Sequence, residues 1–157
     1  MTSRTTLREE LVAVVEQWMT LWQKANTDLV DRLHAEDFHD HGAAGREPGR
    51  DGFRRGIEKL YEAFPDFYAT TDDMVVEESS GKVAVRWTAT GTHKGPFLGF
   101  EPTNRSVTFH GIEIVRIADG VIVERWGEWD GLEIIEQLGS DSNGLETRPI
   151  PTPDVEE

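Results

Sequence analysis

Apolar residues recur every three or four positions in the N-terminal part of the chain. Over residues 6–25 they fall on one side of a helix, and shorter stretches of the same kind follow at 27–33 and 51–64. Pro65 cannot continue a helix and ends the third stretch. The pattern predicts three amphipathic helices, each with one face available for a core.

The hydrophobic period changes after Pro65. Runs rich in β-branched and aromatic residues, separated by turn-forming residues, predict strands, and they cover 67–79, 82–94, 105–117 and 120–129. Asp119-Gly120 is typical of a tight hairpin between the last two runs. Residues 130–139 have the pattern of a short closing helix.

Helices followed by consecutive antiparallel strands indicate an α+β fold, with three N-terminal helices packed on a strongly curved, mostly antiparallel sheet. Such a layer leaves either a filled core or a cone-shaped cavity, and composition does not decide between them. We expect one domain over residues 1–139. Residues 140–157 are polar and contain prolines, which predicts a flexible C-terminal tail.

Composition narrows the class of partner. Thirty acidic residues against 16 basic ones give a net charge of −14, which repels nucleic acid and anionic membranes. No apolar run is long enough to span a bilayer, and the N-terminus lacks the apolar segment of a secretory signal, so we expect a cytoplasmic location. With no cysteine there is no disulfide, thiolate zinc site or thiol nucleophile.

The segment His39-Asp40-His41 raises the question of a metal. On a strand both histidines would share a face and could chelate an ion. The cupin pattern, which uses the same spacing, also needs a carboxylate soon afterwards and another histidine on a later strand. A glycine-rich loop follows here instead, so we expect no metal.

Four motifs carry a family resemblance. In this order, "AFPD", "GTHKGPFLGFEPTNR", "RIADGVIVERW" and "QLG" resemble the SnoaL-like polyketide cyclase family of the nuclear-transport-factor-2-like superfamily, over residues 8–139. The resemblance implies a cone with a pocket between the helices and the concave sheet. It also implies ring closure by intramolecular aldol chemistry without a metal or cofactor, although other members open epoxides.

The resemblance and strand alternation together indicate catalytic residues. The family's acid–base carboxylate falls at Gly127, its polar partner at Glu113 and the histidine of "GTH" at His93. Because glycine cannot transfer a proton, Glu113 is the best substitute, and an apolar cone would raise the pKa of its carboxyl group. Arg125 would pair with Glu113 or stabilise a substrate oxyanion. Gly127 would leave room for a larger ligand.

Each of these roles has a structural alternative. Glu113 and Arg125 could form a buried ion pair that only holds two strands in register. His93 could be a turn histidine that bonds to the "GPF" loop. Asp130 could cap the last helix instead of lying at the pocket rim.

Aromatic and polar side chains are expected to shape the pocket. Trp18, Trp22 and Trp87 suit either a core or a cavity wall for a flat ligand, with at least one of them in the core. The resemblance places polar groups where the first strand meets the cone. The residues expected to contact the ligand are Asp40, His41, Trp18, Trp22, Trp87, Phe109, Gly127, Trp129 and Asp130.

We therefore expect a cofactor-free cyclase or isomerase that acts on a small, hydrophobic, carbonyl-bearing molecule of the polyketide type by general acid–base catalysis. The alternatives are a non-catalytic binding protein, an epoxide-opening enzyme and a dimerisation module with a filled cone. Family members commonly pair across the outer sheet face, and Ile112, Ile114 and Ile122 are expected on the face opposite Glu113. A homodimer is therefore predicted.

Overall fold

The computed structural model describes residues 5–139 as five helices and one five-stranded sheet of order β1-β5-β4-β3-β2. β1 pairs in parallel with β5, and the other neighbours pair antiparallel, so the predicted α+β fold with a mostly antiparallel sheet is confirmed. The predicted tail at 140–157 lies outside the described residues. In chain order the elements are α1 (Leu7–Met19), α2 (Leu21–Lys24), α3 (Leu29–Leu33), β1 (His34–Asp40), α4 (Arg50–Ala63), β2 (Tyr68–Glu77), β3 (Lys82–Thr92), β4 (Ser106–Ala118), β5 (Val121–Trp129) and α5 (Gly131–Gly139).

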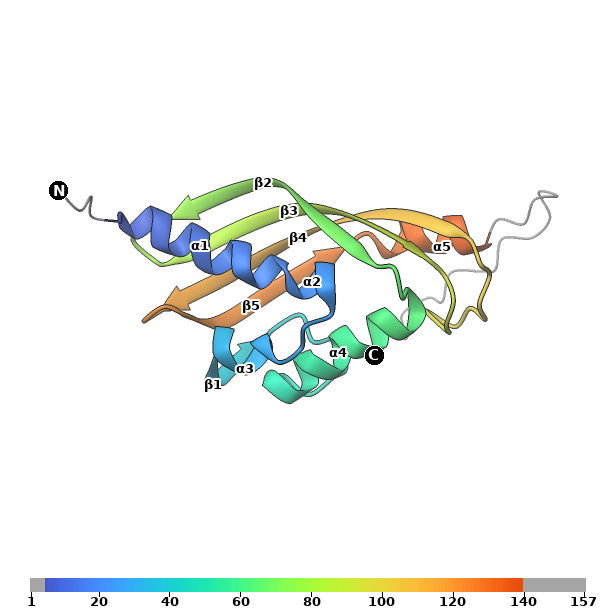
Figure 1. The fold of residues 1–157 in the computed structure, drawn as a ribbon, viewed down its shortest axis with the longest axis horizontal. Coiled ribbons are helices and arrows are strands. Elements are labelled where there is room, and N and C mark those ends of the chain that lie inside the picture. The colour runs from blue at the N-terminus through green and yellow to red at the C-terminus, as the bar shows by residue number, and fades with distance from the viewer. Residues whose placement is uncertain (1–4, 140–157) are drawn as a thin grey trace, which may run out of the picture.

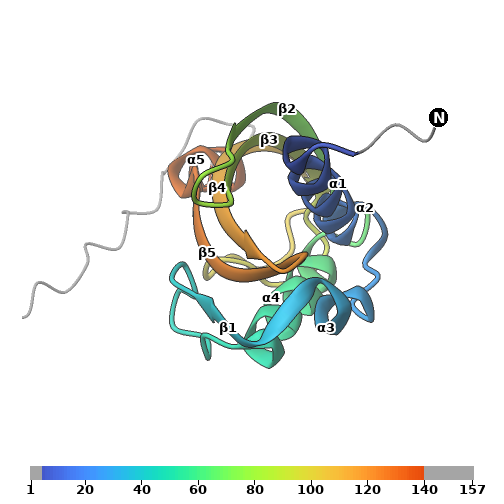
Figure 2. The same ribbon diagram turned by 90° about the vertical axis from the view of Figure 1, so that its left-hand side faces the viewer.

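The sheet curls strongly, and helices cover its concave face. Figure 1 shows α1 and α2 running along the strands, with α4 below them. Seen end-on, strands β2 to β5 form part of a ring that α1 and α2 close on the opposite side (Figure 2). The short helix α5 packs instead against β4 from outside, where the Gln137 side chain bonds to the backbone N–H and C=O of Thr108.

Four helices, not the expected three, precede β2. α1 begins with a capping box between Thr6 and Glu9, but the helix predicted over 6–25 breaks after Met19. The backbone N–H and the hydroxyl of Thr20 both bond to the carbonyl of Gln17, which competes with the regular helical pattern. Trp22 then leaves helical geometry, with φ −99° and ψ 17°.

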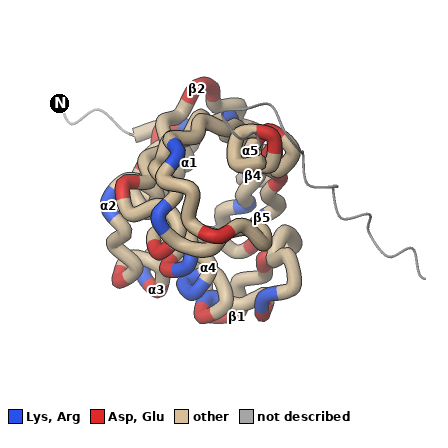
Figure 3. Tube along the Cα trace, turned by 90° about the vertical axis from the view of Figure 1, so that its right-hand side faces the viewer, with Lys and Arg blue, Asp and Glu red and all other residues tan. Residues whose placement is uncertain are grey.

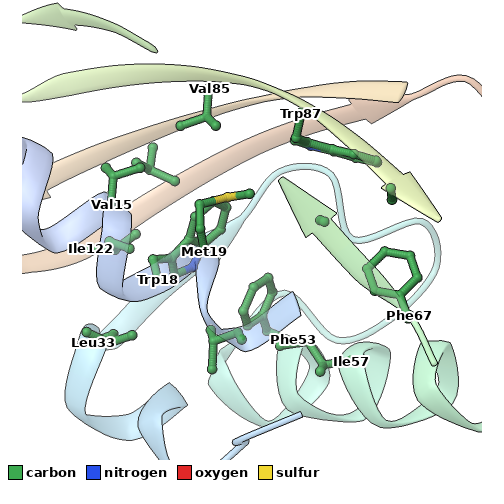
Figure 4. Packing of buried hydrophobic residues seen from close by; sticks show 14 of the residues in the cluster. Val15, Trp18, Met19, Leu33, Phe53, Ile57, Phe67, Val85, Trp87 and Ile122 are labelled. Carbon is green, nitrogen blue, oxygen red and sulfur yellow. The ribbon is translucent and has the colours of Figure 1, made fainter. Parts of the chain in front are cut away.

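A hydrophobic cluster packs between α1, α4 and the sheet. Trp18, Met19 and Phe53 lie in it (Figure 4). The fully buried Trp18 donates its indole N–H to Nε2 of His34 over 3.0 Å, so the proton of the neutral ring lies on Nδ1, which donates to the carbonyl of Val30. Burial lowers the pKa of His34 to about 4, and the ring is therefore neutral at physiological pH.

Strand alternation holds along β4 but is interrupted in β5. The pairing shifts between Arg116–Glu124 and Ile117–Ile122, which leaves Val123 as an extra residue, a β-bulge. Ile122 is therefore fully buried on the inner face, and its predicted place on the outer face is wrong. Beyond the bulge, the sequence count and the structure agree.

Charges of both signs alternate on the outside of the helical layer around α3 and α4 (Figure 3). Arg54 of α4 pairs with Asp31 of α3 and with Asp51 of its own first turn. No helix within residues 5–139 is long and apolar enough to cross a membrane.

Candidate active site

A cavity of about 510 Å³ lies between α4 and the concave face of the sheet. Strands β3 to β5 contribute Trp87, Phe109 and Trp129 to its wall, and the helices contribute Trp22 and Phe53. The break after α1 is what separates the two N-terminal tryptophans, because Trp22 lines the cavity whereas Trp18 is a core residue. A pure dimerisation module would require a filled cone, and the cavity shows that the cone is not filled.

Two charged side chains interrupt the apolar wall. Glu113 of β4 and Arg125 of β5 are only 4% and 7% exposed. Nη2 of Arg125 donates to Oε1 of Glu113 over 3.1 Å and lies 2.9 Å from Oε2. Oε2 is shielded from solvent and is nevertheless without an aligned hydrogen-bond donor among residues 5–139.

Burial dominates the electrostatics of this pair. It raises the pKa of Glu113 above the usual range of a glutamate, because loss of water outweighs the attraction of Arg125. For Arg125 burial alone would lower the pKa, but Glu113 and Asp40 together raise it above its ordinary value. The site therefore joins a permanent cation to a carboxyl group that can exchange a proton closer to neutral pH.

Asp40 lies behind Arg125 instead of on the cavity wall where it was expected. It is buried and accepts three hydrogen bonds: from Nη1 of Arg125 (2.8 Å), from Nη2 of Arg46 (3.1 Å) and from the backbone N–H of Gly42 (3.0 Å). Its oxygens are thereby occupied. Asp40 is not part of the cavity wall and meets it through its bonds to Arg125 and Arg46.

The expectation that Gly127 makes room for a larger ligand is wrong. Gly127 lies directly opposite Glu113 in the strand register. A Cβ atom at this position would stand 2.1 Å from Oε2 of Glu113 and 2.3 Å from Nη2 of Arg125, closer than real contacts allow. The space left by the missing side chain holds the ion pair. Position 127 must be small because position 113 carries the acid.

His93 does not line the cavity, so the proton-transfer role suggested for it stays a prediction without a contact to the cavity. It is fully buried beside Phe64, with 5.6 Å between the ring centroids. Its Nδ1 accepts the backbone N–H of Thr103, so the proton of the neutral ring lies on Nε2. Burial also lowers its pKa. The structural alternative describes His93 better, as an anchor for the loop between β3 and β4.

Two further expected binding residues lie elsewhere. Because Asp40 points inward, strand alternation turns His39 and His41 outward, and the ring of His41 stacks on Trp126 with centroids 4.7 Å apart. Asp130 accepts the backbone N–H of Glu133 and caps α5. Across the described chain, no cluster of three or more histidine, aspartate and glutamate side chains has the arrangement of a metal site.

The cavity wall also contains residues that sequence reasoning missed. Phe53 and Ile57 belong to the amphipathic stretch 51–64, whose pattern does not distinguish core from cavity, and Phe97 belongs to the loop of the "GTHKGPFLGFEPTNR" motif. Arg46 is the most informative omission. Arg46 lies between Gly45 and Gly49, five residues after "HDH". A charged residue in a glycine-rich turn this close to a polar strand end could have indicated a partner for Asp40.

Comparison with known proteins finds similar sequences and structures over most of the chain. The family profile described as SnoaL-like polyketide cyclase matches residues 12–138. Aklanonic acid methyl ester cyclase DauD from Streptomyces sp. (strain C5) is 25% identical over 146 residues, which cover 91% of this chain and 85% of DauD.

Two solved structures show the same fold. TsrD from Streptomyces laurentii superposes with a TM-score of 0.76 at 27% identity, over 84% of this chain and 96% of TsrD. IdmH from Streptomyces antibioticus, a candidate polyketide cyclase, gives a TM-score of 0.72 at 29% identity, over 83% of this chain and 99% of IdmH.

Proposed function

The chain belongs to the SnoaL-like polyketide cyclase family, and from this premise we propose that it is a cofactor-free cyclase or isomerase of a small, hydrophobic, carbonyl-bearing molecule of the polyketide type. One observation carries the proposal. A buried carboxyl group with a raised pKa, Glu113, lies on an otherwise apolar cavity wall beside a cation, Arg125. This is the combination that proton abstraction next to a carbonyl group requires.

In the proposed reaction Glu113, as carboxylate, takes a proton from the carbon next to a substrate carbonyl. The electron pair of that C–H bond moves into an enolate, whose oxygen is stabilised by the positive charge of Arg125. The enolate carbon attacks a second carbonyl of the same molecule and forms a carbon–carbon bond. The resulting alkoxide takes back the proton from Glu113. Atoms and charge balance without a cofactor.

The cavity wall favours this chemistry for a flat apolar substrate. Trp87, Phe109 and Trp129 present aromatic surface on the sheet side, and Trp22 does so on the helical side. A cavity of about 510 Å³ falls within the usual range for small-molecule sites. Exclusion of water also strengthens the attraction between an enolate and Arg125.

The proposal is tested by Glu113→Gln, with Glu124→Gln as the matched control. Glu124 stands one residue before Arg125 on β5 but lies outside the cavity, where it pairs with Arg116. Aklanonic acid methyl ester, the compound in the name of DauD, is the first probe. Polyketide-type esters that raise the melting temperature of the protein would follow it.

We expect Glu113→Gln to lower turnover by about 10²- to 10⁴-fold, because the shape is kept and the proton is lost. Glu124→Gln should keep wild-type turnover, and both variants should keep the wild-type circular dichroism spectrum. Undiminished turnover in Glu113→Gln would reject the mechanism. Tight binding without turnover by the wild type would instead assign a ligand-binding role to the cavity.

We further propose that the protein is a cytoplasmic homodimer that pairs through the outer face of its sheet. Ile112 and Ile114 of β4 are 51% and 38% exposed there. Large exposed aliphatic side chains on a sheet face are typical of protein–protein contacts. Cell fractionation and sedimentation test the two parts of this proposal.

A further inference from the structure

Four side chains form a linear array of alternating charge that begins on the cavity wall. Glu113 contacts Arg125 at 2.9 Å, Arg125 contacts Asp40 at 2.8 Å, and Asp40 contacts Arg46 at 3.1 Å. The members come from four segments: β4, β5, β1 and the loop 41–49. Arg46, at the far end of this charge array, lines the cavity again.

Asp40 divides the charge of Arg125 between two carboxylates. If Arg125 faced Glu113 alone, it would hold that carboxylate in its ionised form, and Glu113 would be a poor proton acceptor. Nη1 of Arg125 is instead bound to Asp40. The negative charge of Asp40 also disfavours a second negative charge on Glu113. Both effects raise the affinity of Glu113 for a proton.

Arg46 acts in the opposite direction, because it neutralises Asp40. Its position is fixed by a close fit against α4: a Cβ on Gly56 would lie 2.8 Å from Nε of Arg46. The loop 41–49 is thus tied to α4 by Gly56 and to β1 by the Asp40 ion pair. The charge array therefore links the loop at the cavity to the carboxyl group inside it.

The remaining groups that face Glu113 add little net charge. From α4 the cavity receives Lys59 and Glu62, one of each sign and both exposed to solvent, which screens them. From β1, His34 is neutral because burial lowers its pKa to about 4. From β3, Trp87 contributes no ionisable group, but hydrogen bonding from its side chain favours the carboxylate and acts to lower the pKa of Glu113.

We propose that Asp40 and Arg46 are positioning residues that set, through Arg125, the pH at which Glu113 gains and loses its proton. Asp40 raises this pH and Arg46 lowers it. The proposal rests on the acid–base role given to Glu113 above, but it concerns a titration that can be observed without substrate.

The test is a direct titration of Glu113 by ¹³C NMR of protein labelled at the glutamate side-chain carboxyl carbon. Loss of one resonance in Glu113→Gln assigns the signal. Asp40→Asn should move the midpoint of Glu113 to lower pH by about one unit. Arg46→Gln should move it to higher pH by a similar amount, because Asp40 is then left to Arg125 alone.

Glu62→Gln is the matched control, because it removes a charge at the cavity mouth outside the charge array and should leave the midpoint in place. Shifts of opposite sign in the two variants support the proposal. Shifts of the same sign, or no shift, overturn it. If Asp40→Asn does not fold, Arg46→Gln decides alone, since Arg46 belongs to a loop and is partly exposed.

Turnover as a function of pH separates this proposal from the proposed function. If the acid limb of the pH–rate profile moves with the NMR midpoint in each variant, both are supported. If the midpoints move as expected while turnover is independent of Glu113, the proton-transfer role fails and the positioning role stands.

Discussion

At residues 112–114 the two faces of β4 depart from the usual distribution of side chains. Towards the helices the strand presents Glu113 beside Arg125 of β5, and away from them it presents Ile112 and Ile114. In a sheet with one face in water, the apolar residues normally face inward. Here the strand buries a charge and exposes two isoleucines, which indicates that neither face is arranged for stability alone.

The two exceptions differ in what they cost the fold. A buried charge loses its hydration, worth several kcal/mol, and recovers this only if partners surround it. The inner face meets this demand with a cation shared between two carboxylates. An exposed isoleucine costs little, since much of any protein surface is apolar. Substitutions on the inner face should therefore affect the fold and those on the outer face should affect association.

The largest effect is expected from Arg125→Met. The substitution leaves Glu113 without its cation and Asp40 with only Arg46, so we expect a loss of about 3–5 kcal/mol in the free energy of unfolding, measured with urea. The outer-face control is Arg116→Met, which breaks the partly exposed Arg116–Glu124 pair and should cost less than about 1 kcal/mol. Equal losses in the two variants would remove the distinction between the faces.

Gly127→Ala should cost about 2 kcal/mol, because its Cβ would overlap the ion pair and force both side chains to move. Turnover should fall more than stability, since the acid is displaced. In a double-mutant cycle with Glu113→Ala, the second substitution should cost less than in the wild-type background, because only Arg125 then remains in that space. If the losses of stability from Gly127→Ala and Glu113→Ala are strictly additive, the two side chains do not compete for the same space.

The buried histidine predicts how stability depends on pH. His34 takes up a proton near pH 6.5 when unfolded, but burial lowers its pKa to about 4 in the folded protein. Between these values the unfolded chain binds more protons, so stability is full above pH 6.5 and declines as the pH falls towards 4. From pH 7 to 5 the wild type should lose about 2 kcal/mol more than His34→Gln.

The smallest effect on the fold is expected from Ile112→Thr combined with Ile114→Thr. The free energy of unfolding of the protomer should change by less than about 0.5 kcal/mol, because both side chains are exposed. Sedimentation velocity at micromolar concentration should nevertheless change from a dimer to a monomer. Leu7→Thr, an exposed substitution on α1, should leave the dimer intact. If the wild-type protein sediments as a monomer, the proposed dimer through this face is wrong.

The sequence predicts most of the fold, because hydrophobic period and turn residues are local properties. Alternation along β4 correctly turned Glu113 inward, and the hairpin at Asp119-Gly120 was sufficient to pair the last two strands. It failed at Ile122 because a bulge is a register adjustment between two strands, and a single strand does not show it. The break between α1 and α2 had a local cause at Thr20, but a hydroxyl within a helical pattern does not by itself predict a break.

The site was predicted in part, and three of the differences share one physical origin. Strand position identified the inward Glu113 and Arg125, since alternation decides a direction. Neither a strand face nor a helix face separates a cavity wall from the layer behind it, and Asp40, His93 and Trp18, which were expected at the cavity, lie in that layer. The distance of a side chain from the cavity depends on how several elements pack together. The hydrophobic pattern of one element indicates only which of its faces a residue lies on.

The opposed positions Glu113 and Gly127 limit how the carboxyl group of this site could move between strands in evolution. They share one compartment that has room for a single acid, carried by either strand. To move the acid from β4 to β5 by single substitutions, the protein must pass through a state with two side chains in that space or a state with none. The first intermediate is overpacked and the second lacks a proton carrier. Either strand can therefore carry the acid, but only one at a time. Simultaneous substitution of positions 113 and 127 is the only change that avoids both unfavourable intermediates.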